Sequence, residues 1–129
     1  MPDAIAQFDK AKYLNLETFR KTGVGVRTPV WFAQDRAATD RVVFFIYSEA
    51  DAGKAKRIRN IPKVRVAPCN FRGDLRGAWV DARARFGSGE ETERGQQLLR
   101  QRYGLLKIVG DFFSRLMRHK TLVIVIELG

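Results

Sequence analysis

The sequence predicts a mainly β protein, an antiparallel β-barrel of about six strands with helices beside it. Short apolar segments with a two-residue period recur along the chain, as strands with one buried face require. Several of them are joined by turns that contain glycine, which suits hairpins and therefore antiparallel pairing. Because an antiparallel sheet must protect its edge strands, closure into a small barrel is the economical architecture.

The first predicted elements are a short helix and a hairpin. Residues 3–12 have the apolar spacing of a short amphipathic helix, with Asp3 as its N-cap. Alternating residues then predict two strands, over 14–18 and 24–32. Gly23 lies in the turn between them, where a positive φ is expected.

Pro29 interrupts the second strand of this hairpin. Proline has no N–H to donate to a ladder, so we expect this strand at a sheet edge or bulged at the proline. Backbone groups beside such an interruption are free to face a planar ring. An edge proline that blocks aggregation explains the same pattern equally well.

The middle of the chain predicts a strand, a short helix and two more strands. Residues 41–47, "RVVFFIY", consist mostly of the β-branched and aromatic residues that strands favour. The basic segment 53–60 is predicted as a helix of one or two turns, closed by Pro62. Strands over 63–69 and 78–86 follow, each with alternating inward and outward residues.

The last third predicts helices and a closing strand. Ser88 and three glutamates form an acidic helix start, and this helix is expected to end at Gly104. Residues 105–120 continue in a helical pattern, and 121–128 form a buried strand. No repeat, linker or low-complexity tract interrupts the chain, so residues 1–129 are predicted to be one domain.

Charge and cysteine content narrow the classes of function. The chain has 24 Lys and Arg against 14 Asp and Glu, a formal charge of +10, which favours anionic partners. A lone cysteine, Cys69, excludes an internal disulfide and a zinc site, and predicts a cytoplasmic protein. The sequence contains no signal-peptide pattern and no apolar run long enough to span a membrane.

The helix over 53–60 holds four positive charges within six residues. Lys54 and Arg57 are three positions apart and share one helix face, so they can grip one phosphate. Gly53 near the helix start allows a close backbone approach, and the free N–H groups there favour an anion. The alternative interpretation is a solvated basic face with no ligand.

Three stretches resemble the pyridoxamine 5′-phosphate oxidase-like split-barrel superfamily: "TFRKTGVGVRTPVWFA", "YSEADAGKAKRIRNIPKVRVAP" and "GAWVDARARF". More narrowly, they resemble its branch that binds the deazaflavin coenzyme F-420. The resemblance covers residues 13–86, and it also takes in the stretch "LLRQRYGLLKIV", residues 98–109, and the last strand. It implies a homodimer of six-stranded antiparallel split β-barrels, of FMN-binding split-barrel type, with two cofactor clefts at the dimer interface.

The resemblance also implies which residues hold the coenzyme. Its phosphate would lie at the start of the basic helix, against Ser48, Gly53, Lys54 and Arg57, and Lys56 and Arg59 would meet its acidic tail. Its ring would lie along the second strand, beside Thr28, Pro29 and Val30. We hypothesise that the Thr28 hydroxyl and the Val30 amide contact the polar edge of the ring. Ala52 departs from the family, where some relatives carry a basic residue, so phosphate binding is expected to be weaker or differently arranged.

The function expected from this resemblance is a reductase that transfers hydride between the deazaflavin and a small organic substrate. The proton would come from water or from a tyrosine such as Tyr47, and no catalytic residue is assigned. Two alternatives stay open: an FMN-binding oxidase or reductase of the same fold, and a coenzyme-binding protein without turnover. Nucleic-acid binding is not expected, because the charges are scattered and no exposed aromatic platform is apparent.

Three further candidates have ordinary structural explanations. Cys69 is expected to be buried and inert rather than a nucleophile. His119, between Arg118 and Lys120, is expected to cap a helix C-terminus. Trp79, Arg83 and Arg85 alternate outward on one strand and are predicted to form a dimer surface or a solvated face. The sequence has no motif typical of metal hydrolysis, acyl transfer or nucleotide hydrolysis.

Overall fold

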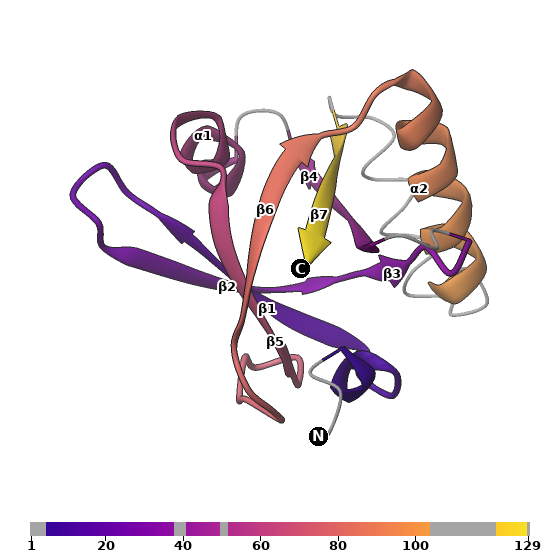
Figure 1. Cartoon of the computed structure of the whole chain (residues 1–129), viewed down its shortest axis with the longest axis horizontal. Coiled ribbons are helices and arrows are strands. Elements are labelled where there is room, and N and C mark those ends of the chain that lie inside the picture. The colour runs from indigo at the N-terminus through magenta and orange to yellow at the C-terminus, as the bar shows by residue number, and fades with distance from the viewer. Residues whose placement is uncertain (1–4, 38–40, 50–51, 104–120, 129) are drawn as a thin grey trace.

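The structure is a computed structural model that describes residues 5–37, 41–49, 52–103 and 121–128. Seven strands and two α-helices make up the described chain (Figure 1). In chain order the elements are the 3₁₀ turn η1 (Ala6–Phe8), β1 (Tyr13–Phe19), β2 (Gly25–Trp31), β3 (Ala33–Gln34), β4 (Val42–Glu49), α1 (Gly53–Asn60), β5 (Lys63–Cys69), β6 (Val80–Phe86), α2 (Gly89–Tyr103) and β7 (Thr121–Leu128).

All seven strands belong to one antiparallel sheet with the order β2-β1-β5-β6-β7-β4-β3. Its two edge strands, β2 and β3, are consecutive in the chain and are separated only by Phe32. The expected split barrel is confirmed, but the expected count of six strands is wrong. The predicted strand 24–32 corresponds to β2, which ends at Trp31, and the additional strand is the short β3, in which Ala33 pairs with Phe45 of β4.

The β1–β2 hairpin forms as its sequence predicts. Gly23 has a φ of 90°, and the Arg20 amide donates to the Val24 carbonyl across the turn at 2.9 Å. β2 is an edge strand, which is where a proline, having no N–H to donate to a ladder, is tolerated. The expectation that Pro29 marks an edge is therefore confirmed.

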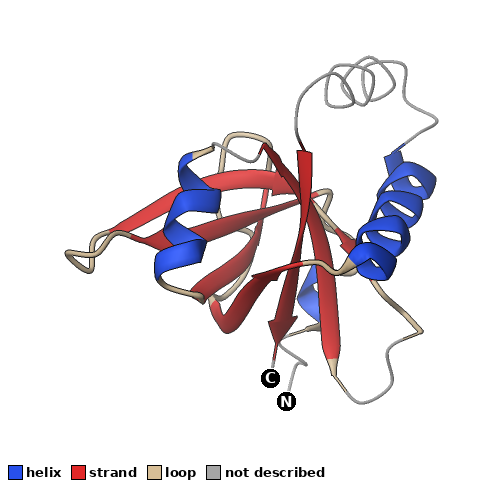
Figure 2. Ribbon diagram, turned by 90° about the horizontal axis from the view of Figure 1, so that it is seen from above, coloured by secondary structure: helices blue, strands red, loops and turns tan. Residues whose placement is uncertain are grey.

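Two hydrophobic clusters hold the sheet in its curled shape. The inner cluster fills the barrel and is built around Leu16, Phe32, Phe44 and Ile126, all nearly inaccessible to solvent. The outer cluster lies between α2 and the strands β3, β4 and β7. Figure 2 shows the curled sheet with α1 on one side and α2 on the other. The helices cover different parts of the sheet: α1 packs against β1, β4 and β6, and α2 packs against β3, β4 and β7.

Helix predictions are confirmed for the two α-helices and wrong for the first segment. The basic helix spans Gly53–Asn60 and the acidic one Gly89–Tyr103, close to the expected limits. The predicted helix over 3–12 is only the 3₁₀ turn Ala6–Phe8, which buries Phe8 in the inner cluster. Three predictions lie outside the described residues: the N-cap at Asp3, the helix predicted over 105–120 and the C-terminal cap at His119. No described helix is long and apolar enough to cross a membrane.

Candidate functional site

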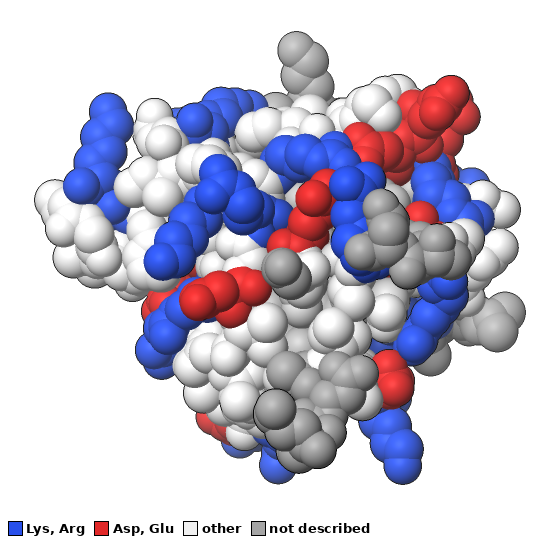
Figure 3. Space-filling view, viewed as in Figure 1, with Lys and Arg blue, Asp and Glu red and all other residues white. Residues whose placement is uncertain are grey.

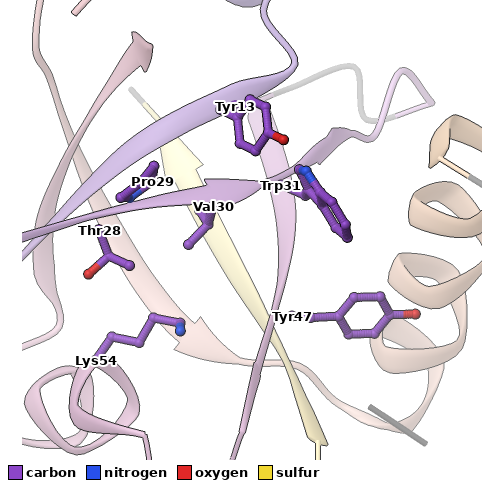
Figure 4. Close-up of a pocket in the computed structure, with 7 residues that line it drawn as sticks. All are labelled: Tyr13, Thr28, Pro29, Val30, Trp31, Tyr47 and Lys54. Atoms are coloured by element: carbon purple, nitrogen blue, oxygen red, sulfur yellow. The ribbon is translucent and has the colours of Figure 1, made fainter. Parts of the chain in front are cut away.

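A pocket of about 340 Å³ lies where β2, β4 and the start of α1 meet (Figure 4). Its volume is at the lower end of the range for small-molecule sites. The lining residues are Tyr13, Thr28, Pro29, Val30, Trp31, Tyr47 and Lys54. The pocket therefore joins the two segments that the sequence singled out, the proline-interrupted strand and the basic helix.

One end of the pocket is aromatic. Tyr13 of β1 lies opposite Trp31 of β2, with ring centroids 6.4 Å apart. Trp31 in turn stacks on Tyr103 of α2 at 5.3 Å and an interplanar angle of 22°. The Tyr103 hydroxyl accepts a hydrogen bond from the Phe32 amide at 3.2 Å and lies 2.8 Å from the Lys12 and Phe32 carbonyl oxygens. These bonds hold the stack in place, so this end presents fixed flat surfaces.

The other end of the pocket carries a cation. Lys54 comes from the first turn of α1, and its side chain points toward Thr28 and Val30 in Figure 4. Burial lowers the pKa of Lys54, Glu49 acts in the opposite direction, and Arg57 lowers it further. Lys54 makes no ion pair with any carboxylate in the described part of the chain. An anion in the pocket would therefore relieve the cost of this partly buried charge.

The start of α1 has no cap of its own. Ala52 occupies the N-cap position, where its methyl group cannot accept a hydrogen bond, and the first turn contains no acidic residue. Ala52 therefore supplies no acceptor to the first N–H groups of this helix, and the helix dipole adds positive potential there. Such a helix end attracts an anion.

Arg57 lies back over this helix start and does not line the pocket. Its Nε donates to the Thr18 Oγ1 at 2.6 Å, and one of its terminal nitrogens would lie only 2.8 Å from a Cβ added at Gly53. Glycine at position 53 therefore makes room for the guanidinium. Lys54 and Arg57 are near neighbours at the helix start, but only Lys54 reaches the pocket.

The two β4 residues have different surroundings. Ser48 is buried, and its hydroxyl donates to the Glu49 carbonyl at 3.0 Å, so it does not line the pocket. Tyr47 lines the pocket with its ring, while its hydroxyl points toward α2 (Figure 4). Burial raises the pKa of Tyr47, and Arg100 of α2 partly offsets this effect. The Tyr47 hydroxyl therefore keeps its proton at neutral pH.

The donors and surfaces of this pocket fit a flavin-type coenzyme. A phosphate needs cationic and N–H donors, which Lys54 and the uncapped start of α1 supply. A planar ring needs flat apolar contacts, which Pro29, Val30 and Trp31 supply beside the Thr28 hydroxyl. Among the described residues, no group of acidic, histidine and cysteine side chains is arranged to hold a metal ion.

Tyr13 and Trp31 are pocket residues that sequence reasoning did not assign. The hairpin sequence could have identified them. Counting residues outward along both strands from the turn at Gly23 pairs Tyr13 with Trp31, which lies two positions beyond Pro29. The other candidates have structural roles. Cys69 is buried as expected, and Arg85 donates to Glu91 and Glu127 within the chain.

No protein-family model matches the chain, and no curated protein resembles it in sequence. Solved structures do resemble it. A candidate pyridoxamine 5′-phosphate oxidase of Listeria innocua is 15% identical with a TM-score of 0.63, over 95% of this chain and 87% of the other. The heme storage protein HutZ of Vibrio cholerae is 16% identical with a TM-score of 0.66, over 99% and 89%.

An F-420 reductase is 18% identical to this chain with a TM-score of 0.60, over 100% of this chain and 96% of the other. At such identities the likeness concerns the fold alone. The named functions differ among these structures, from reductase to heme storage, so the fold by itself does not select one. The chain has the fold of pyridoxamine 5′-phosphate oxidase-like split-barrel proteins.

Proposed function

We propose that this protein is an oxidoreductase that binds coenzyme F-420 and transfers hydride between it and a small organic substrate. The observation that carries this proposal is the pocket itself. It combines a partly buried lysine at an uncapped helix start with flat apolar surfaces on the neighbouring edge strand. The fold shared with an F-420 reductase supports the choice of a deazaflavin.

Each part of the pocket has a role in this proposal. Lys54 and the first N–H groups of α1 bind the coenzyme's phosphate, and Arg57 adds positive charge above Gly53. Ser48 is proposed to support this phosphate end from beneath. Pro29 and Val30 contact the ring, with the Thr28 hydroxyl and the Val30 amide at its polar edge.

When bound, the coenzyme supplies a hydride carrier, and the chain's residues orient it and exclude water from one side. The Trp31–Tyr103 stack fixes the far wall, so a ring placed against β2 has limited freedom. The Tyr47 hydroxyl holds its proton at neutral pH and points toward α2 (Figure 4), and we propose that it donates this proton to a substrate through water.

We further propose that the protein is a homodimer whose second copy completes the cleft. The pocket is bounded by the sheet edge β2, and an edge strand is where another chain can cover a site. The molar mass in solution, measured by light scattering, tests this: twice the mass of one chain is expected, and a monomer at micromolar concentration contradicts it.

The experiment for the main proposal is a titration with F-420 and with FMN, followed by the fluorescence of each compound. Micromolar F-420 binding is expected, and the double variant K54A/R57A should lose it. Preference for FMN would move the protein to the alternative oxidase or reductase function, and absence of binding to either would overturn the proposal. Reduction of an acceptor by reduced F-420 then separates an enzyme from a coenzyme-binding protein.

A further inference from the structure

A second pocket, of about 510 Å³, lies between the N-terminal turn and the loop after β5. Figure 1 shows these two segments side by side, although they are far apart in the sequence. One wall carries Lys10 and Lys12, and the other carries Phe71 and Arg76, with Cys69 between them. Tyr13 lines this pocket and the first one, so the two pockets are neighbours.

The walls of this second pocket are fixed by hydrogen bonds. The Gln7 amide group donates to the Ala78 carbonyl and accepts from the Ala78 amide, both at 2.9 Å, which joins the two walls. Asn70 Oδ1 accepts hydrogen bonds from the Arg72 and Asp74 amides, which shapes the loop. The Arg76 amide donates to Pro68 of β5 at 2.8 Å. The pocket is therefore preformed, which lowers the entropy cost of binding.

The electrostatic character of the pocket is cationic. Lys10, Lys12 and Arg76 are exposed, and none forms an ion pair with a carboxylate in the described ranges. Within the part of the chain that the structure describes, no Asp or Glu lines the pocket. Asp74 lies near Cys69, but its carboxylate accepts a hydrogen bond from Asn70 at 3.0 Å.

The Cys69 side of the pocket is neutral. Burial raises the pKa of the Cys69 thiol to about 11, and Asp74 raises it as well. The thiol is therefore protonated at physiological pH, so the three cations are the charged groups that face a ligand here. A ligand with an acidic group is favoured by charge complementarity.

The pocket also offers aromatic surface. Phe71 is 62% exposed, the largest exposure among the large hydrophobic residues of the described chain. Phe71 lies in the hydrogen-bonded loop and lines the pocket, and the Arg72 guanidinium carbon lies 5.3 Å from the centroid of its ring. An exposed phenyl ring beside three cations suits a ligand that has both a flat apolar body and an anionic group.

We propose that this second pocket is a binding site for a small aromatic carboxylate. Lys10, Lys12 and Arg76 bind its carboxylate, and Phe71 and Tyr13 contact its rings. Because Tyr13 borders both pockets, the bound anion lies next to the first pocket. If the first pocket holds the coenzyme, as proposed above, a ligand of this second pocket binds beside it; this last step rests on the proposed function.

The test is calorimetric titration with 2-naphthoate, without any coenzyme. The full chain should bind one equivalent saturably, and the triple variant K10Q/K12Q/R76Q should bind at least tenfold more weakly. The matched variant K21Q/K63Q/R83Q removes the same charge from exposed residues elsewhere and should bind within twofold of the full chain. F71S should weaken binding without any change in charge.

Three results would overturn the inference: no saturable binding, equal losses in both triple variants, or equal affinity for the uncharged 2-naphthalenemethanol. K54M tests whether the first pocket contributes to this binding: the variant should bind 2-naphthoate as tightly as the full chain does. Naphthoate binding without F-420 binding supports this site and defeats the proposed function. F-420 binding without naphthoate binding leaves the proposed function intact and defeats this inference.

Discussion

The two α-helices of this protein begin in opposite ways. At the start of α2, the Glu91 amide donates to the Ser88 hydroxyl at 3.2 Å, and Glu91 accepts from the Ser88 amide at 3.0 Å. Arg85 of β6 then donates two hydrogen bonds of 2.5 Å to the Glu91 carboxylate. At the start of α1, Ala52 caps nothing and Lys54 puts a positive charge at the positive end of the helix dipole.

The start of α2 is thus stabilised by its own side chains, whereas the start of α1 is not. The reciprocal Ser88–Glu91 pair is a capping box, and it satisfies donors that would otherwise need water. Among the described residues, neither a side-chain acceptor at the N-cap nor an acidic residue in the first turn stabilises the start of α1, so a bound anion would supply both an acceptor and a negative charge. Figure 3 shows the same contrast on the surface, where acidic side chains gather over the start of α2 and basic ones spread over the hairpin and α1.

The largest expected effect concerns α1 and the coenzyme. K54M keeps a chain of similar length but removes the charge, so it should weaken F-420 binding by roughly 10- to 100-fold, the value of a charge-assisted hydrogen bond. Fluorescence titration measures this loss. K63M, at an exposed position outside the pocket, is the control, and an equal loss in K63M would mean that only overall charge matters.

The second effect concerns the stability of α2. E91A removes the acceptor of the capping box and one partner of Arg85, so it should lower the free energy of unfolding by about 1–2 kcal/mol. Urea denaturation measures the difference. Glu93 is exposed on the same helix, and E93A should change stability far less. Equal effects of the two substitutions would contradict the capping role of Glu91.

The same pair predicts a pH dependence. The hydrogen bond from Arg85 lowers the pKa of Glu91 from 4.5 to about 2. A carboxyl whose pKa is lower in the folded state stabilises the fold above its unfolded pKa and loses this contribution as the pH falls. The stability difference between the natural chain and E91Q should therefore be full at pH 7 and shrink between pH 4.5 and pH 2. A difference that stays constant over that range would be inconsistent with this pair.

The smallest effect is a gain in stability. Removing the positive charge of Lys54 from the start of α1 should stabilise the ligand-free protein by about 0.3–1 kcal/mol, because that charge opposes the helix dipole. K54M should thus be slightly more stable and bind the coenzyme much less well. Thermal unfolding without ligand measures this, and a clear loss of stability in K54M would show that Lys54 serves the fold.

Local patterns predicted much of this structure, because they depend on neighbours in the chain. The limits of α1 follow from the basic segment and Pro62, and the position of β2 at an edge follows from Pro29. The acidic start of α2 likewise indicated its helix. In each case the sequence pattern that predicts the element lies within the element itself or directly beside it.

Features that depend on distant contacts were not predicted. The break at Phe32 reflects pairing of Ala33 with Phe45, and nothing within residues 24–32 announces it. The hydrogen bond from the Arg57 Nε to Thr18, a residue 39 positions earlier in the chain, was likewise not predicted, and the role of Arg57 at a phosphate stays a prediction. The aromatic end of the pocket depends on Tyr103 of α2, which stacks on Trp31.

The most direct test of the central claim compares the affinities of two ligands. One is F-420, and the other is the same deazaflavin ring with its ribityl chain but without the phosphate. Both are titrated against the natural chain and against K54M. If the start of α1 binds the phosphate, the natural chain should prefer F-420 by at least about tenfold, and K54M should lose most of this preference. An equal preference in both proteins, or none in the natural chain, would contradict an anion site at the start of α1.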